Sequence, residues 1–140
     1  MQEVGNSIRR AAVASVIVAG AAWVLCGCDG MYIRRIDVTG PDAAAFAVDG
    51  QSTQAVVATL RAYAAGGKLS CSDSNALPFE CRRQPIRVTV VSTQQGVAVC
   101  YFARGTQFER KKFEGYIQHL QEMLVSRFGA ASVTAVQAMC

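Results

Sequence analysis

The sequence predicts a small α+β domain in which two helices cover one face of an antiparallel sheet. Three observations predict this fold class. Apolar and polar residues alternate at 86–90, and Ile36 and Val38 lie two apart within 32–38, as is typical of half-buried strands. Apolar residues recur at helical spacing at 52–65 and 108–128, which indicates amphipathic helices. Glycines and polar turn residues separate these stretches, and no internal repeat or low-complexity linker interrupts them.

The first strand is expected at 32–38, and Gly40-Pro41-Asp42 breaks it. Residues 43–48 are ambiguous and could form a second short strand before the turn at Asp49-Gly50.

The first helix is expected to follow that turn. Either Ser52 or Thr53 can cap its start, because a hydroxyl oxygen can accept a hydrogen bond from the free N–H groups there. Gly66-Gly67 is expected to end it. Its apolar face comprises Val56, Val57, Leu60 and Tyr63.

A hairpin is expected at 86–91 and 97–103, which flank a loop ending in a turn glycine. The second of these strands is apolar on both faces, which predicts a central position in the sheet. A second helix is expected at 108–128, ending before Gly129, and a last strand at 132–137. The helix has a regular apolar stripe, formed by Phe113, Ile117, Leu120, Leu124 and Phe128.

The expected order, strand-helix-strand-strand-helix-strand, is that of the ferredoxin-like, split βαβ arrangement. The chain has 140 residues, enough for one domain, and its 51% hydrophobic residues exclude a disordered chain. The formal net charge is +4, from 14 basic and 10 acidic residues, without a long basic block. We therefore expect no nucleic-acid partner.

The amino-terminal segment has the layout of a secretory signal. Arg9 and Arg10 lie in a polar head, and residues 11–25 that follow are apolar and uncharged. This run is short for a helix that spans a bilayer, which needs about 20 apolar residues. An uncleaved membrane anchor remains an alternative.

The stretch Leu25-Cys26-Gly27-Cys28 resembles the lipobox of bacterial lipoproteins, and the resemblance covers residues 1–28. It implies that a signal peptide, 1–27, is cut between Gly27 and Cys28. The Cys28 thiol would carry diacylglycerol, and its new amino group would carry an acyl chain such as palmitate. Cys26 departs from the family, which usually has Ala, Ser or Val there, and would be removed with the signal peptide.

The resemblance also implies a location. The mature domain, 28–140, would be lipid-anchored at a bacterial cell membrane and face the periplasm. Asp29 resembles the inner-membrane retention signal of enteric lipoproteins, although the outer membrane stays open. The alternative is ordinary cleavage after Ala19-Gly20-Ala21, which would leave Cys26 and Cys28 in the mature chain.

Four cysteines remain in the mature chain, and an even number in an exported protein suggests two disulfides. Cys71–Cys81 is favoured because the residues between them are turn-rich, and Cys100–Cys140 then follows by elimination. In the ferredoxin-like order the last strand pairs with the first, so the second bond needs the tail to fold back across the sheet. Either this pairing or the strand order is therefore open, and buried free thiols are the alternative to disulfides.

We find no residues arranged for catalysis or metal binding. No Cys-x-x-Cys occurs, so we expect no metal, and no cofactor beyond the lipid on Cys28. His119 lies off the apolar stripe of its helix, which predicts a solvated side chain. Asp73 and Glu80 share a loop without a pocket to make them an acid–base pair. We therefore expect no enzymatic activity.

Three surface features stay open. Arg110-Lys111-Lys112 opposes the helix dipole, so it could face anionic lipid, although a solvated face with an Arg110–Glu114 pair is the simpler interpretation. Arg82-Arg83 is a second basic cluster. Leu77-Pro78-Phe79 could dock a partner or fold back onto the core.

These observations favour a lipid-anchored cell-envelope protein that binds or assembles with another envelope protein. One alternative is a carrier of lipid or a small ligand, with a cavity between sheet and helices. Another is a thiol-redox protein that uses a reactive cysteine or His119.

Overall fold

A computed structural model of the chain describes residues 30–140, so the predicted cleavage and lipidation site at Gly27 and Cys28 lies outside the described residues. The chain begins with β1 (Gly30–Thr39) and α2 (Gln51–Gly67). Four strands follow: β2 (Ser70–Cys71), β3 (Phe79–Arg83), β4 (Ile86–Ser92) and β5 (Gly96–Gly105). The short 3₁₀ helix η1 (Gln107–Glu109) leads into α3 (Arg110–Phe128), and η2 (Ala130–Ser132) leads into β6 (Val133–Val136).

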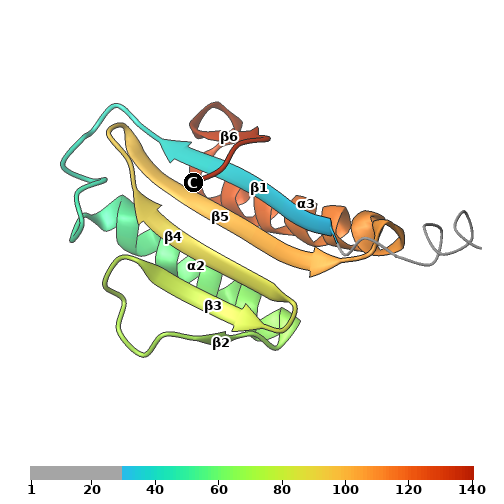
Figure 1. The fold of residues 1–140 in the computed structure, drawn as a ribbon. Helices are drawn as coiled ribbons and strands as arrows, with labels where there is room; N and C mark the ends of the chain where they lie inside the picture. Colours follow the sequence, from blue (N-terminus) through green and yellow to red (C-terminus); the bar gives the residue numbers. More distant parts are fainter. Residues whose placement is uncertain (1–29) are drawn as a thin grey trace, which may run out of the picture.

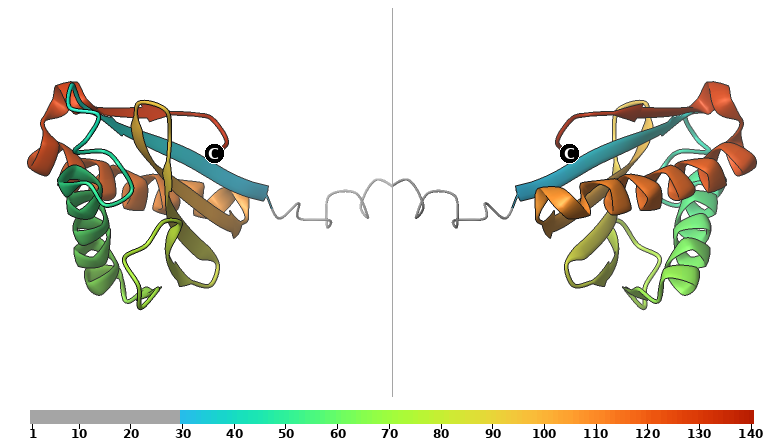
Figure 2. Two further views of the ribbon diagram at one scale, coloured as in Figure 1. Left: turned by 90° about the vertical axis from the view of Figure 1, so that its left-hand side faces the viewer. Right: turned by 90° about the vertical axis from the view of Figure 1, so that its right-hand side faces the viewer.

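The six strands form one antiparallel sheet in the order β2-β3-β4-β5-β1-β6. Both α-helices lie on one face of this sheet, and the face turned toward the viewer in Figure 1 carries no helix. Figure 2 shows the same two layers from the sides. The predicted α+β class, with two helices on an antiparallel sheet, is confirmed, as is the central position of β5.

The sheet order differs from the predicted ferredoxin-like order because the structure has two more strands. β2 and β3 form where the sequence predicts a loop, and they extend the sheet beyond β4. In β3, Phe79 and Cys81 are buried against the helices, whereas Arg82 points to solvent. Residues 43–48 form turns rather than the short strand considered for them, and Asp42 Oδ1 accepts hydrogen bonds from the backbone N–H groups of Ala44 and Ala45.

The helix starts also differ from their predictions. α2 begins after Gly50, without a side-chain cap, and Thr53 is fully buried beneath the helix rather than capping it. α3 begins at Arg110, later than expected, because residues 107–109 form η1. In η1, Thr106 and Glu109 form a reciprocal capping box that satisfies backbone N–H groups at this start.

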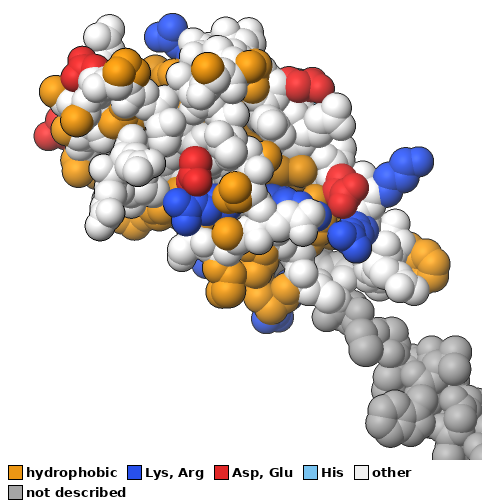
Figure 3. All heavy atoms as spheres, turned by 90° about the horizontal axis from the view of Figure 1, so that it is seen from above, with side chains coloured by type: hydrophobic (Ala, Val, Ile, Leu, Met, Phe, Trp, Pro, Cys, Tyr) orange, Lys and Arg blue, Asp and Glu red, His pale blue; other side chains and the backbone are white. Residues whose placement is uncertain are grey.

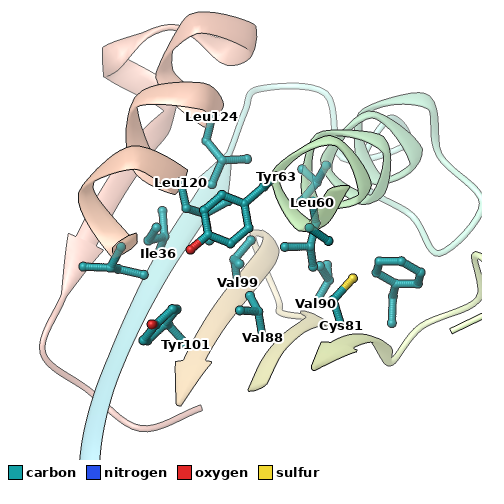
Figure 4. Close-up of a cluster of buried hydrophobic side chains, with 14 of the residues drawn as sticks. Ile36, Leu60, Tyr63, Cys81, Val88, Val90, Val99, Tyr101, Leu120 and Leu124 are labelled. Atoms are coloured by element: carbon teal, nitrogen blue, oxygen red, sulfur yellow. The ribbon is translucent and has the colours of Figure 1, made fainter. Parts of the chain in front are cut away.

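The core lies between the sheet and the two helices (Figure 4). The predicted helix stripes supply one side of it, and Phe128 alone among the predicted stripe residues of α3 is only partly buried. Alternate residues of the strands supply the other side, which follows from the two-residue period of a strand. Figure 4 labels Ile36, Leu60, Tyr63, Cys81, Val88, Val90, Val99, Tyr101, Leu120 and Leu124 in this cluster.

Candidate functional site

Both predicted disulfides are present in the structure. Cys71 and Cys81 occupy directly opposite positions on β2 and β3, with their Cα atoms 3.9 Å apart. This bond lies on the helix side of the sheet, where Cys81 is fully buried. The Cα atoms of Cys100 and Cys140 are 6.2 Å apart, and Cys100 points away from the helices. The two bonds therefore tie the chain together on opposite faces of the sheet.

The path of the carboxyl-terminal tail reconciles the second disulfide with the strand order. β6 pairs with β1, as predicted for the last strand, and not with β5. Arg35 on β1 lies opposite both Val136 on β6 and Cys100 on β5, so the three positions form one row across the sheet. After Val136 the chain turns back over β1 and reaches Cys100, as Figure 1 shows near the C-terminal mark. The tail thus crosses a single strand.

The face of the sheet without helices carries apolar and charged side chains side by side. Arg87 on β4 places its guanidinium carbon 5.3 Å from the ring centroid of Phe102 on β5. Arg35 Nε donates to Asp37 Oδ1 at 2.6 Å, along β1. We call this the uncovered face; its other apolar members include Ile33 and Val91, which are partly buried.

Three elements meet at the end of the molecule where the described chain begins. Gly30, the first residue of β1, pairs with Gly105, the last residue of β5. η1 and then α3 start directly after Gly105, so the first turn of α3 lies at the same end. Figure 1 shows the start of β1, the end of β5 and the start of α3 together at the right-hand end of the sheet. We define the Gly30-end surface by Met31, Arg104, Phe108, Arg110, Lys111 and Lys112.

Two exposed apolar side chains belong to the Gly30-end surface. Phe108 is 86% exposed and Met31 is 59% exposed. Among the described residues, the other large exposed apolar side chains are Val48 and Met139. Met31 lies directly opposite Arg104 in the pairing of β1 with β5, so an apolar and a cationic side chain are neighbours here.

The cations of this surface exceed its acids. From Arg104 to Lys112 the sequence has four basic residues and one acid, Glu109. The Glu109 carboxylate is already engaged locally, because its Oε2 accepts a hydrogen bond from the Thr106 N–H at 3.0 Å. Arg110 reaches Glu114 at 3.4 Å, which confirms the predicted i,i+4 pair, whereas Arg104 and Lys111 have no ion-pair partner among the described residues.

The cations oppose the dipole of α3. Its first turn contains no acidic residue and begins with three consecutive cations. The N-terminal end of a helix carries partial positive charge, so this arrangement destabilises the helix slightly. A local arrangement that lowers stability without a structural gain is a candidate for function.

A shallow groove of about 300 Å³ opens between the start of β1 and the start of α3. Its base is aromatic, with the ring centroids of Tyr32 and Phe113 5.9 Å apart. Arg34 and Arg110 line it, and both approach the same Glu114 carboxylate oxygen at 3.4 Å. Burial raises the pKa of Tyr32 above its usual value, so its hydroxyl stays neutral. The groove therefore combines an uncharged aromatic base with two guanidinium groups.

Side chains singled out from the sequence for other chemistry are not brought together. His119 is exposed on α3, as expected, and its nearest aromatic neighbour is Tyr63, with ring centroids 6.0 Å apart. Asp73 is exposed in a loop, whereas Glu80 lies 4.0 Å from both Arg82 and Arg87. Within residues 30–140, no three His, Cys, Asp or Glu side chains cluster in a way that could hold a metal ion.

The Leu77-Pro78-Phe79 segment folds back onto the core, one of the two alternatives considered for it. Phe79 is fully buried, and Leu77 packs against the core cluster. The Arg61 guanidinium carbon lies 4.6 Å from the centroid of the Phe79 ring and covers it on the outside.

Two tyrosines lie in the core, Tyr63 on the predicted apolar face of α2 and Tyr101 on the predicted central strand β5. The Tyr63 hydroxyl donates to the Tyr116 carbonyl oxygen at 3.2 Å, and burial raises the pKa of Tyr63 to about 12. Burial also raises the pKa of Tyr101, which is fully buried on β5. These groups remain protonated, and their place in the core gives them a packing role.

Helix α3 is the longest helix of the described part, and neither it nor α2 is both long and apolar enough to cross a membrane. No family model, no curated protein and no solved structure matches this chain.

Proposed function

We propose that this chain is a bacterial lipoprotein. Its signal peptide, 1–27, is removed, Cys28 carries the lipid, and the domain faces the periplasm from an envelope membrane. The observation that carries this proposal is the stretch Leu25-Cys26-Gly27-Cys28 at the end of an apolar run. Strand β1 is already formed at Gly30, two residue steps after Cys28, a span of at most about 7 Å. The domain therefore starts directly beside the predicted lipid, without room for a linker.

The two disulfides support an exported location. Disulfides persist in oxidising compartments such as the periplasm and are rare in the cytosol. Both pairs join residues of the folded domain, Cys71 with Cys81 and Cys100 with Cys140. In the periplasm these bonds would stay oxidised. Because Asp29 resembles an inner-membrane retention signal, the inner membrane is favoured over the outer membrane.

Within the envelope, the domain acts as a non-enzymatic binding or assembly component. The uncovered face supports this role, because it offers a partner both apolar and charged contacts, such as Phe102, Arg87 and Asp37. A carrier needs an internal cavity, but the space between sheet and helices is occupied by one continuous cluster of side chains. A thiol-redox role needs a reactive thiol, but the four cysteines of the described part are paired.

The ferredoxin-like relationship is proposed for part of the fold. The four strands predicted from the sequence correspond to β1, β4, β5 and β6, and they are neighbours in the order β4-β5-β1-β6. α2 follows β1, and α3 follows β5, as the split βαβ order requires. In this interpretation, the β2–β3 hairpin is an addition at the edge of β4.

The lipid proposal is tested by the intact mass of the protein extracted from bacterial membranes. We expect a chain that begins at Cys28 and carries acyl chains. Cys28→Ala should retain its signal peptide and lack the lipid, because no thiol remains to accept it. Cys26→Ala is the matched control, since it places a residue usual in lipoproteins at that position and should be processed normally. An unmodified chain, beginning after Ala21 or at Met1, would contradict the proposal.

The assembly role is tested separately by site-specific photo-cross-linking in cells. A photoreactive residue at Arg87, exposed on the uncovered face, should give a product of discrete higher mass. The control position is Ser126, which is also exposed but lies on α3, on the opposite side of the sheet. Equal labelling at the two positions, or none at either, would contradict a partner on the uncovered face.

A further inference from the structure

We infer that the Gly30-end surface is a membrane-contact surface that binds the anionic head groups of phospholipids. This inference rests on the proposed lipid anchor, and it adds a second, non-covalent attachment to the same membrane. The occupant of the surface is the bilayer into which the Cys28 acyl chains insert.

The Gly30-end surface lies close to the proposed lipid attachment site at Cys28. With the lipid on Cys28, Gly30 lies within about 7 Å of the modified residue. Gly105 pairs with Gly30, and Arg104 pairs with Met31, so the end of β5 lies equally near. Phe108 and the first turn of α3 follow within a few residues of Gly105. The Gly30-end surface therefore cannot be far from the head groups.

The exposed apolar side chains of this surface suit a membrane interface. Phe108, at 86% exposed, has little contact with the domain itself. An aromatic ring that projects beside cationic side chains suits the boundary between head groups and acyl chains, where the ring is buried and the charges remain hydrated. Met31, at 59% exposed, lies at the start of β1, opposite Arg104.

The net positive charge of this surface favours lipids with anionic head groups. The segment Arg104–Lys112 has four cations against Glu109, whose carboxylate is held by the Thr106 N–H. Arg104 and Lys111 have no ion pair among the described residues, so both are available to an outside anion. Anionic head groups would also offset the repulsion between these cations and the dipole of α3. In Figure 3, Lys or Arg side chains and an apolar side chain lie close together at the right-hand end of the coloured surface.

The groove adds a binding site for a single phosphate group to this surface. Arg34 and Arg110 both approach one carboxylate oxygen of Glu114, so two guanidinium groups share one acid. Their remaining N–H groups can donate to a phosphate in the groove, which opens at this same end.

Tryptophan fluorescence can test the contact with little background. Trp23 is the single tryptophan of the sequence, and it precedes Cys28, so the proposed mature chain has none. Phe108→Trp then reports only on the Gly30-end surface. Val48→Trp is the matched control, because Val48 is also exposed and lies in the loop after the far end of β1. The acylated proteins are reconstituted in vesicles with brominated acyl chains, which quench tryptophan on contact.

We expect quenching and a blue shift of Trp at position 108, but not at 48, in vesicles of phosphatidylethanolamine and phosphatidylglycerol. The effect should weaken in neutral phosphatidylcholine vesicles and at high salt, which screens surface charge. Arg104→Gln with Lys111→Gln should lower the equilibrium constant for contact with the bilayer by about 25-fold, from about fivefold per cation. Equal signals at 108 and 48, or equal quenching in neutral and anionic vesicles, would overturn the inference.

The intact mass of each reconstituted protein separates this inference from the proposal beneath it. An acylated protein whose position 108 remains unquenched would overturn the membrane contact alone and leave the lipoprotein proposal intact. It would also show that the cations form a solvated helix face. An unacylated mass would overturn the lipoprotein proposal, and the membrane contact would fall with it.

Discussion

The disulfide between Cys100 and Cys140 should stabilise the domain chiefly by restricting its unfolded state. The two residues are 40 positions apart, and closing a loop of this size removes chain entropy worth about 4 kcal/mol at 25 °C. The tail itself contributes little burial, since Cys140 is exposed and Met139 is 75% exposed. The double variant Cys100→Ala/Cys140→Ala should therefore lose about 4 kcal/mol of unfolding free energy.

Urea unfolding, followed by circular dichroism of a chain that starts at Asp29, measures this loss. A second variant serves as control: Cys100→Ala with residues 138–140 removed should be as unstable as the double alanine variant, because the tail acts through its bond. A loss below about 1 kcal/mol in the double variant would refute the loop-closure reasoning. A much larger loss in the truncated variant would show that the tail stabilises the sheet by contacts of its own.

Three further predictions concern the core and the backbone. Leu120→Ala, at a fully buried site on α3, should lower the unfolding free energy by about 2–5 kcal/mol, and a smaller loss in urea unfolding would show that the core collapses into the gap. Gly96→Ala should destabilise the β4–β5 turn, because the new Cβ would collide with the Val38 carbonyl oxygen. Gly66→Ala on α2 is the contrasting variant: its Cβ meets no atom within 4 Å, so it should raise the unfolding free energy by about 0.5–1 kcal/mol. Equal thermal midpoints for the two variants would contradict this prediction. Burial raises the pKa of Tyr63 from 10.0 to about 12 in the folded domain, so Tyr63 ionises at lower pH when the chain is unfolded. Each rise of one pH unit between these two values should therefore lower the unfolding free energy by about 1.4 kcal/mol. Denaturant titrations from pH 8 to 11.5 measure this slope, and Tyr63→Phe should reduce it; an unchanged slope would assign the alkaline loss to other groups.

The parts of the fold that the sequence predicts correctly depend on local periodicity. The stripe Phe113, Ile117, Leu120 and Leu124 on α3 repeats the helical period over several turns, so it is visible without any knowledge of the sheet. The β4–β5 hairpin is similarly local. β2, with two residues, has no period to detect; it forms because Cys71 lies opposite Cys81 and because Phe79 and Cys81 are buried. The turns at 43–48 depend on Asp42, whose carboxylate binds the following N–H groups.

The candidate site was visible in part for the same reason. Arg110-Lys111-Lys112 is a run of neighbours in the sequence, and its conflict with the helix dipole is evident from the helix prediction alone. Met31 and Arg104 are distant in the sequence, and only the register of β1 with β5 makes them neighbours. The route of the tail back to Cys100 likewise requires the strand order, which short-range patterns do not contain.

The length and direction of β1 would set the height of an anchored domain. The strand spans ten residues, about 30 Å, and it runs from the Gly30 end to the opposite end of the sheet. Standing on its lipid, the domain would hold the 93–95 turn and the 40–50 loop about 30 Å above the head groups at most. A partner on the uncovered face would then lie beside this upright strand, close to the membrane at Ile33 and farther out at Asp37. Along β1, each later residue would then lie farther from the bilayer than the one before it.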